Sequence, residues 1–270
     1  MLDPSIYRIA TGTKINWADH DPQAKTGFDG GKTEGKAALR PLTKQLATLQ
    51  RKLWAEAERS LLVVLQATDT GGKDGTIRHV FRGVNPQGVH VHNFRQPTEL
   101  ELAHDYLWRV HKRTPEDGAI AVFNRSHYED VLVVRVRELA PESVWSKRYR
   151  HINEFERMLS DEGTRIVKIY LDISKDEQAE RLQARLDDPD AIWKFKRSDL
   201  EDRVYWDDYR AAFKQAIEET STEYAPWYIV PANRKWYRNL VVSRILIDTL
   251  QDMDPDYPEP EEDLEDVVIT

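Results

Sequence analysis

A glycine-rich segment carries the residues best suited to chemistry. Residues 67–74 read Ala-Thr-Asp-Thr-Gly-Gly-Lys-Asp, and residues 61–65 before them are all apolar. In phosphate-binding loops of the pattern G-x-x-x-x-G-K-[ST], glycines let backbone amides surround a phosphate and the lysine neutralises it. Because this segment follows a predicted strand and opens a predicted helix, we interpret it as a phosphate cradle. The alternative is an ordinary turn with a solvated lysine.

Two positions depart from the usual composition of such a loop, and the loop also carries two carboxylates, Asp69 and Asp74. Ala67 replaces the first glycine, and Asp74 replaces the hydroxyl residue that would hold Mg²⁺. Carboxylates repel a phosphate unless a cation lies between them, and Mg²⁺ is commonly held by one or two carboxylates plus phosphate oxygens. We therefore expect Asp69 to bind Mg²⁺, with Mn²⁺ as a substitute. Asp74 is either a further ligand or a favourable charge at a helix N-terminus.

A second polar cluster follows the apolar run of residues 119–123. It contains Asn124, Arg125, Glu129 and Asp130. An arginine at the end of a strand can bind two phosphate oxygens, and the two acids could complete a metal site. The alternative is that the acids only begin the next helix.

Basic side chains gather between residues 181 and 203. Arg181 and Arg185 are four residues apart and so share one helix face, and Lys194 follows. A polyanionic chain needs several bases in succession, and this segment supplies them. A charged face in solvent is the usual alternative.

Five short β-rich runs are expected to form the sheet that positions these clusters. They are residues 61–65, 89–94, 119–123, 165–171 and 227–230. Helical sequence separates each run from the next, which predicts parallel strands, crossover connections and a three-layer α/β fold. Ligands of such sheets bind at the carboxyl ends of the strands, so the polar loops should converge there.

The remaining organisation follows from periodicity. Leucines spaced by three and four residues predict an amphipathic helix from Leu39, with Pro41 in its first turn. Residues 1–36 show no sustained period and are predicted to form an N-terminal arm. Residues 37–252 are expected to form one domain, and residues 253–270 an acidic C-terminal tail.

Composition excludes several classes of function. Nine of the 47 acidic residues lie in residues 252–266. In the rest of the chain the number of acidic residues differs from the 39 basic residues by only one. A nearly neutral body without a long basic stripe argues against nucleic acid as a partner. The chain has no cysteine, no apolar run near 20 residues and no signal segment at its N-terminus. We expect a cytoplasmic protein without membrane contact.

Several blocks within residues 61–239 together closely resemble the polyphosphate kinase 2 family. They are ATDTGGKDGTIRHVF, GVNPQGV, YLWRVH, FNRSHYEDVLVVRV, RYRHINEFERML, ISKDEQAERLQARLDDPDAIWKFKRSDLEDR and ETSTEYAPWYIVPANRKWYRN. The resemblance implies a P-loop kinase-like fold similar to thymidylate kinase, with a parallel five-stranded sheet and a helical lid at about residues 188–203. It also implies Mg²⁺-dependent phosphoryl transfer between inorganic polyphosphate and a nucleotide.

The resemblance also assigns roles. Catalytic roles fall on Asp69, Lys73, Arg125, Glu129 and Asp130, and metal binding on Asp69, Glu129 and Asp130. The residues expected to bind polyphosphate are Thr70, Gly71, Gly72, Lys73, Asp74, Gly75, Arg125, Arg181, Arg185 and Lys194. Many relatives have Asp where this chain has Asn124, and this chain looks like the branch that accepts both nucleoside monophosphates and diphosphates.

The acceptor nucleotide is expected beside the second strand. The residues assigned to it are Asn85, Pro86, Phe94, Arg95, Thr98, Asn124 and Glu129. A nucleotide's terminal phosphate oxygen is already anionic and needs no general base, so His127 is interpreted as structural. The aromatic residues predicted to lie in the core are Tyr205, Trp206, Tyr209 and Phe213.

We therefore expect a polyphosphate:nucleotide phosphotransferase that converts AMP to ADP and ADP to ATP. We also expect the reaction to be reversible. Two alternatives stay open: an ATP-dependent nucleoside monophosphate kinase, and a non-catalytic polyanion-binding module. The resemblance also implies a homodimer or a homotetramer.

Overall fold

The computed structural model describes residues 2–195 and 197–260, with the side chains of residues 194 and 198 excepted. The strands are β1 (Arg8–Ile9), β2 (Ser60–Gln66), β3 (Val89–Asn93), β4 (Ile120–Asn124), β5 (Thr164–Asp172) and β6 (Trp227–Pro231). The α-helices are α1 (Lys32–Glu56), α2 (Lys73–Val80), α3 (Glu99–Leu102), α4 (Trp108–His111), α5 (Val133–Val136), α6 (Glu142–Trp145), α7 (Arg148–Asp161), α8 (Lys175–Asp187), α9 (Arg197–Val204), α10 (Trp206–Thr220) and α11 (Lys235–Met253). Short 3-10 helices are η1 (Pro4–Tyr7), η2 (Trp17–Asp19), η3 (Pro86–Gly88), η4 (His127–Asp130) and η5 (Ile192–Lys194).

The sheet has six strands in the order β1-β6-β5-β2-β4-β3. The five strands predicted from sequence are present, and each pairs in parallel with its neighbour. The sixth, β1, pairs antiparallel with β6, with Arg8 opposite Tyr228. This strand corrects the five-stranded prediction. A two-residue strand is too short to show the alternation by which strands are recognised.

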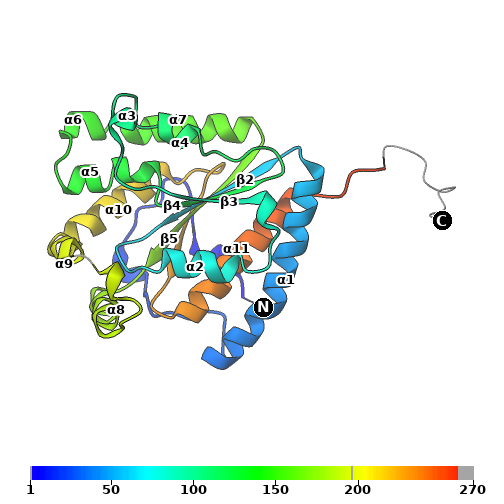
Figure 1. The fold of residues 1–270 in the computed structure, drawn as a ribbon, viewed down its shortest axis with the longest axis horizontal. Helices are drawn as coiled ribbons and strands as arrows, with labels where there is room; N and C mark the ends of the chain where they lie inside the picture. The colour runs from blue at the N-terminus through cyan, green and yellow to red at the C-terminus, as the bar shows by residue number, and fades with distance from the viewer. Residues whose placement is uncertain (1, 196, 261–270) are drawn as a thin grey trace.

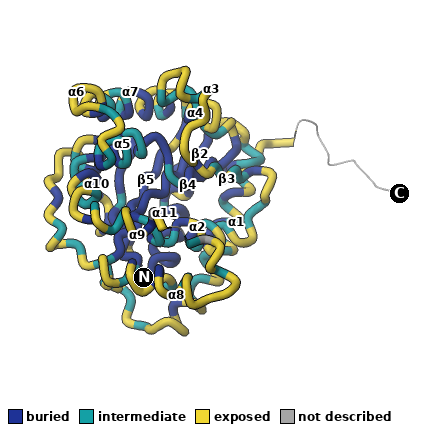
Figure 2. The backbone as a smooth tube through the Cα atoms, turned by 60° about the vertical axis from the view of Figure 1, so that its left-hand side comes forward, coloured by how far each residue is buried: buried dark blue, intermediate teal, exposed yellow. Residues whose placement is uncertain are grey.

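Helices cover both faces of the sheet. Figure 1 shows α1, α2 and α11 on one side, and α5, α7 and α10 on the other. Each side has its own apolar core. All positions of β2 and β4 are buried, as is typical of strands covered on both faces, and these strands run through the dark-blue interior in Figure 2. None of the helices in the described residues is long and apolar enough to cross a membrane.

Helix α1 begins earlier than predicted, at Lys32, so that Pro41 lies inside the helix. The Glu34 side chain accepts a hydrogen bond from the Gly31 N–H at 2.9 Å and so caps the first turn. A Cβ at Gly35 would lie only 2.2 Å from the Trp236 ring, so glycine permits α1 to approach α11 closely. This packing offsets the hydrogen bond that Pro41 removes.

Candidate active site

The phosphate loop connects β2 to α2 at the carboxyl edge of the sheet. Thr70 and Gly72 have φ of +62° and +97°, so the chain reverses sharply before α2. Gly71 is required for space, because a Cβ there would lie 2.4 Å from the Cβ of Ala67. The N–H groups in the first turn of a helix have no partner within that helix and suit an anion. The loop therefore has the backbone form of a phosphate cradle.

Lys73 is buried at the start of α2. Its Nζ donates to the carbonyl oxygen of Ala67 at 3.1 Å. Burial, followed by the charge of Arg125, lowers the pKa of Lys73 to about 8, and three acids, Asp69 first, oppose this shift. The ammonium is still mostly protonated at pH 7, and a phosphate would stabilise its charge.

Arg125 faces the loop from the end of β4. Its Nη2 donates to Oδ1 of Asp69 at 2.8 Å, and its backbone N–H donates to the carbonyl of Leu65. Its φ is +61°, a costly conformation for a non-glycine residue that is often found at functional sites. Glu129 and then Asp69 raise the pKa of Arg125, while burial opposes them. A fixed positive charge thus lies beside the cradle.

A pocket opens between the phosphate loop and the start of α10. Asp69, Arg125, Glu129 and Asp202 line its polar side. Burial raises the pKa of Asp69, but Arg125 and Lys73 outweigh it, so that this pKa lies below its usual value. Burial raises the pKa of Asp202, and the nearby charge of Asp69 adds to this shift. The ion pair with Arg137 opposes it. A larger cavity of about 510 Å³ between α7 and α10 is lined by none of the predicted site residues.

Sequence reasoning missed several residues of this pocket. Asp202 belongs to α9 and lies between Glu201 and Arg203, so nothing in this run of charged residues distinguishes it in the sequence. Gln178 is buried in α8 and donates to the carbonyl of Asp69 at 3.1 Å, which supports the loop from behind. Trp206 and Phe213 are buried, as predicted, and they also form the apolar wall of the pocket. Tyr209 is only partly buried and lines the same wall.

Asp130 does not join Asp69 and Glu129, which corrects the expected three-carboxylate metal site. Its Oδ1 accepts from Nη1 of Arg148 at 3.0 Å, because the side chain turns toward α7. Burial, opposed by Arg148, raises the pKa of Asp130 to about 6. Among the described residues, no group of three or more His, Cys, Asp and Glu side chains is arranged to hold a metal ion.

Asn124 connects the ends of three elements. Its Nδ2 donates to Oδ1 of Asp74 at 2.6 Å and to Oδ1 of Asn93 at 2.7 Å. Asp74 therefore lies against β4 instead of facing the pocket lined by Asp69. An aspartate at position 124 would place two carboxylates in direct contact, which is unfavourable without a proton or a cation between them.

The expected nucleotide residues divide between two edges of the sheet. Phe94, Arg95 and Thr98 follow β3 at the carboxyl edge, where Phe94 is buried against Phe123. Thr98 caps α3 through a hydrogen bond to the Glu101 N–H.

Asn85 and Pro86 precede β3 and so lie at the amino edge, away from the phosphate loop. Their assignment to the nucleotide is corrected. The reason is that α2 returns the chain to the start of the next parallel strand.

Arg181 is not an exposed lid base. It is 8% exposed, and its guanidinium donates to the carbonyls of Thr70, Ala232 and Asn233. These contacts pin the phosphate loop to the connection between β6 and α11. The guanidinium expected to bind polyphosphate is thus occupied by backbone carbonyls, and the alternative of a charged face in solvent is also wrong for this residue. Arg185 forms an ion pair with Asp199 at 3.6 Å, and the side chain of Lys194 lies outside the described part of the chain.

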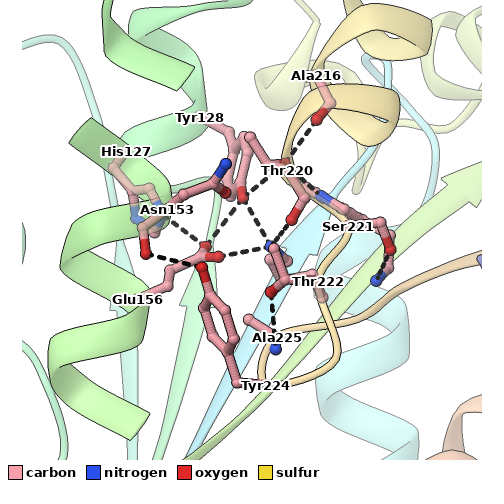
Figure 3. A network of polar contacts seen from close by, with 12 residues as sticks. His127, Tyr128, Asn153, Glu156, Ala216, Thr220, Ser221, Thr222, Tyr224 and Ala225 are labelled. Carbon is pink, nitrogen blue, oxygen red and sulfur yellow. Dashed lines mark hydrogen bonds and ion pairs between the residues drawn. The ribbon is translucent and has the colours of Figure 1, made fainter. Parts of the chain in front are cut away.

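A buried polar network supports the loop that carries Arg125 and Glu129 (Figure 3). Lys168 and Glu156 are fully buried and paired, and Lys168 also donates to the Tyr128 hydroxyl at 2.9 Å and the Thr220 carbonyl at 2.6 Å. Nε2 of His127 lies 3.2 Å from Glu156. His127 is therefore structural, as predicted, and the network fixes η4 beside the pocket.

Comparison with known proteins places these features in a family. The profile of the Polyphosphate kinase 2 (PPK2) family matches residues 30–258. The AMP/ADP-polyphosphate phosphotransferase of Meiothermus ruber is 57% identical over 263 residues, which cover 97% of this chain and 98% of that protein. The ADP-polyphosphate phosphotransferase of Rhodopseudomonas palustris is 43% identical, over 94% of this chain and 91% of that protein.

The fold agrees with these similarities. The crystal structure of Polyphosphate Kinase 2 from Arthrobacter aurescens TC1 superposes with a TM-score of 0.94 and 46% identity, covering 97% of this chain and 94% of that one. The phosphate loop, its buried lysine and the facing arginine are thus set in a scaffold shared with these proteins. This chain belongs to the polyphosphate kinase 2 family.

Proposed function

We propose that this protein transfers the terminal phosphoryl group of inorganic polyphosphate to AMP, giving ADP, and to ADP, giving ATP, in a reversible reaction. The observation that carries the proposal is the placement of Lys73 and Arg125 on two sides of a glycine-rich loop that also bears Asp69. The names of the two relatives, phosphotransferases acting with polyphosphate on AMP/ADP and on ADP, support the choice of donor and acceptors.

The protein's own groups position and neutralise the reactants. The loop amides and Lys73 bind the donor phosphate, and Arg125 leaves Asp69 to bind the transferred group. Phosphoryl transfer needs donor, phosphorus and acceptor oxygen in line, with charge stabilised on the transferred oxygens. The acceptor phosphate is already anionic, which agrees with the absence of a histidine among the residues that line the pocket.

Phosphotransferases of this family generally depend on a divalent metal, and the donor set here fits such an ion. Asp69 and Glu129 line one pocket and offer the oxygen ligands that Mg²⁺ prefers, with phosphate oxygens completing its coordination. We propose Mg²⁺ as the usual ion and Mn²⁺ as a substitute. Its chemistry would be to neutralise the phosphates and lower the barrier to transfer.

Further assignments extend the proposal. Phe94, Arg95 and Thr98 are proposed to contact the nucleotide, because they lie at the carboxyl edge beside Asn124. Arg185 and Lys194 are proposed to bind the polyphosphate chain. Closure of residues 188–203 would exclude water from the pocket and limit hydrolysis. Assembly into a homodimer or homotetramer and a cytoplasmic location are also proposals.

One assay tests the function against its competitors. Purified protein is mixed with Mg²⁺, AMP or ADP, and either long-chain polyphosphate or ATP as donor, and the nucleotide products are separated. We expect ADP and ATP from polyphosphate. Transfer from ATP alone would identify an ATP-dependent nucleoside monophosphate kinase. Binding of polyphosphate without any product would identify a non-catalytic module.

A further inference from the structure

A buried arginine touches the phosphate loop from the side of α11. Arg238 is only 2% exposed. A Cβ at Gly72 would lie 2.0 Å from its Nη1, and one at Gly75 would lie 3.4 Å from its Nη2. Its Nε and Nη2 donate to the amide oxygen of the neighbouring Asn239. Among the described residues, its Nη1 has no hydrogen-bond acceptor and its guanidinium has no carboxylate partner.

The surroundings of Arg238 are also positive. Arg181 also lies beside Gly72, where its Nη1 would be 3.5 Å from the same Cβ. Lys235 is exposed one turn earlier on α11, at a spacing that places it on the same helix face. Burial, and then Arg181, lowers the pKa of Arg238 to about 9. Burial and Arg181 also lower the pKa of Lys235, with Arg238 and Lys32 adding to the shift and Glu177 alone opposing it.

This arrangement is unfavourable in the free protein. A buried cation costs several kcal/mol unless it is paired, and like charges add to that cost. The first turn of α2 is moreover the positive end of a helix dipole, which disfavours a nearby guanidinium. A purely structural contact with Gly72 would be served better by an uncharged side chain. An anion held over the loop would offset the cost of burying the guanidinium, the repulsion between like charges and the unfavourable helix dipole.

We propose that Arg238 and Lys235 form a second polyphosphate subsite, on the α11 side of Gly72, that holds phosphates of the donor chain beyond the one that reacts. The inference rests on the proposed function and extends it. Arg238 contacts the phosphates nearest the loop, and exposed Lys235 contacts those further along the chain. Arg238 and Lys235 together form a track of bases for the polyphosphate chain. Arg181 holds this track beside the phosphate loop, because its guanidinium donates to the carbonyls of both Thr70 and Ala232. A chain of repeated negative charge matches such a row of bases.

The decisive variant is Arg238→Met, with Arg244→Met as its control. Arg244 lies on the same helix but has its own partner, Asp248, at 2.6 Å. We expect Arg238→Met to raise the Kd for tripolyphosphate and for long polyphosphate by about tenfold or more, the scale of one charge-assisted hydrogen bond. The KM values for AMP and ADP should stay within about twofold, and the unfolding midpoint of the free protein should not fall. The control should bind both phosphates as the wild type does.

Three results would overturn the subsite: an unchanged Kd for polyphosphate, equal losses for polyphosphate and nucleotide, or a lower unfolding midpoint of the free Arg238→Met protein. If that variant does not fold, Lys235→Met carries the test. It should weaken long polyphosphate more than tripolyphosphate, and equal or absent effects would contradict the track. A wild type that binds polyphosphate but transfers nothing refutes the proposed function and not the subsite. An active enzyme whose variants bind normally refutes only the subsite.

Discussion

Two groups of buried charges in this protein differ in one respect. The network on the α7 side, formed by Lys168, Glu156 and their neighbours, contains an acid for its base, and the three N–H groups of Lys168 match three oxygen acceptors. The cluster on the α11 side contains Arg238 and Arg181, and among the described residues Glu177 is the acid paired with it. The base of the first group is thus paired within the protein, whereas the second group carries an excess of positive charge.

The difference separates a structural use of charge from a binding use. A hydrogen-bonded network whose base is paired with its own acid orders the parts that it joins, here η4, β5, α7 and the end of α10. An excess of positive charge near a phosphate loop stores an unfavourable energy that a bound anion releases. The following predictions test this distinction, beginning with the largest expected effect.

Lys168→Met should destabilise the protein most. It leaves Glu156 buried without its partner, which typically costs about 3–5 kcal/mol of unfolding free energy. Urea denaturation measures this loss. The double variant Lys168→Met/Glu156→Leu should recover a large part of it, because no unpaired charge remains. A single variant as stable as the wild type would contradict the structural role of the network.

Lys73→Ala should reduce turnover by ~10² to 10³, which is the scale of removing one preorganised electrostatic group. The unfolding free energy should change little, because within the described part of the chain Lys73 donates a single side-chain hydrogen bond, to Ala67. Steady-state kinetics with polyphosphate and ADP measure the effect. Near-normal turnover would exclude the loop as the phosphate cradle.

Asp69→Asn and Asp130→Asn should differ in their response to Mg²⁺. Loss of Asp69 should raise the Mg²⁺ concentration for half-maximal activity by roughly tenfold, since even outer-shell changes at metal sites have effects of that size. Asp130→Asn should leave this concentration unchanged, because its carboxylate is paired with Arg148. The two Mg²⁺ titrations decide the matter, and equal shifts would return Asp130 to the metal site.

Affinity for polyphosphate should fall as the pH rises through about 8. The pKa of Lys73 is lowered to about 8 in the free protein, and a bound phosphate raises it again, so the anion binds the protonated form. Between pH 7 and pH 9 the Kd should increase by about tenfold. Calorimetry in the absence of nucleotide measures it. In Lys73→Met the increase should be much smaller, and a Kd as dependent on pH as that of the wild type would point to another group.

Asn124→Asp should give the smallest effect, a change of a few-fold in the ratio of the AMP and ADP reactions. The new carboxylate would lie against Asp74 and favour a cation at that point, and so alter the position of the acceptor phosphates. The separate rates of the two steps, with polyphosphate as donor, give the ratio. A wild-type enzyme that uses only one of the two acceptors would contradict the dual-acceptor proposal.

The sheet and the phosphate loop were predictable because their signals are local. Continuous apolar runs such as residues 61–65 mark buried parallel strands, and the glycines with Lys73 follow one of them directly. The parallel alternation also contained the information to exclude Asn85 and Pro86, since a crossover helix always returns the chain to the opposite edge. Strand β1 carried no usable signal in two residues.

Long-range pairing explains the remaining errors. A run of charged residues on a helix gives no sign of which base will be buried, and Arg181 is buried because distant carbonyls of Thr70 and Ala232 accept its hydrogen bonds. Asp130 likewise turns away from Asp69 because Arg148, on another helix, is available. Arg238 belongs to a block that resembles the family, but its burial beside Gly72 and next to Arg181 is visible only in the structure.

The pairing of β1 with β6 has a consequence for folding during synthesis on the ribosome. Arg8 lies opposite Tyr228, so β1 is synthesised long before β6, the strand with which it pairs. At ~5–20 residues per second this delay is on the order of tens of seconds. During that time β1 has no partner strand. Its docking therefore follows the synthesis of all five parallel strands.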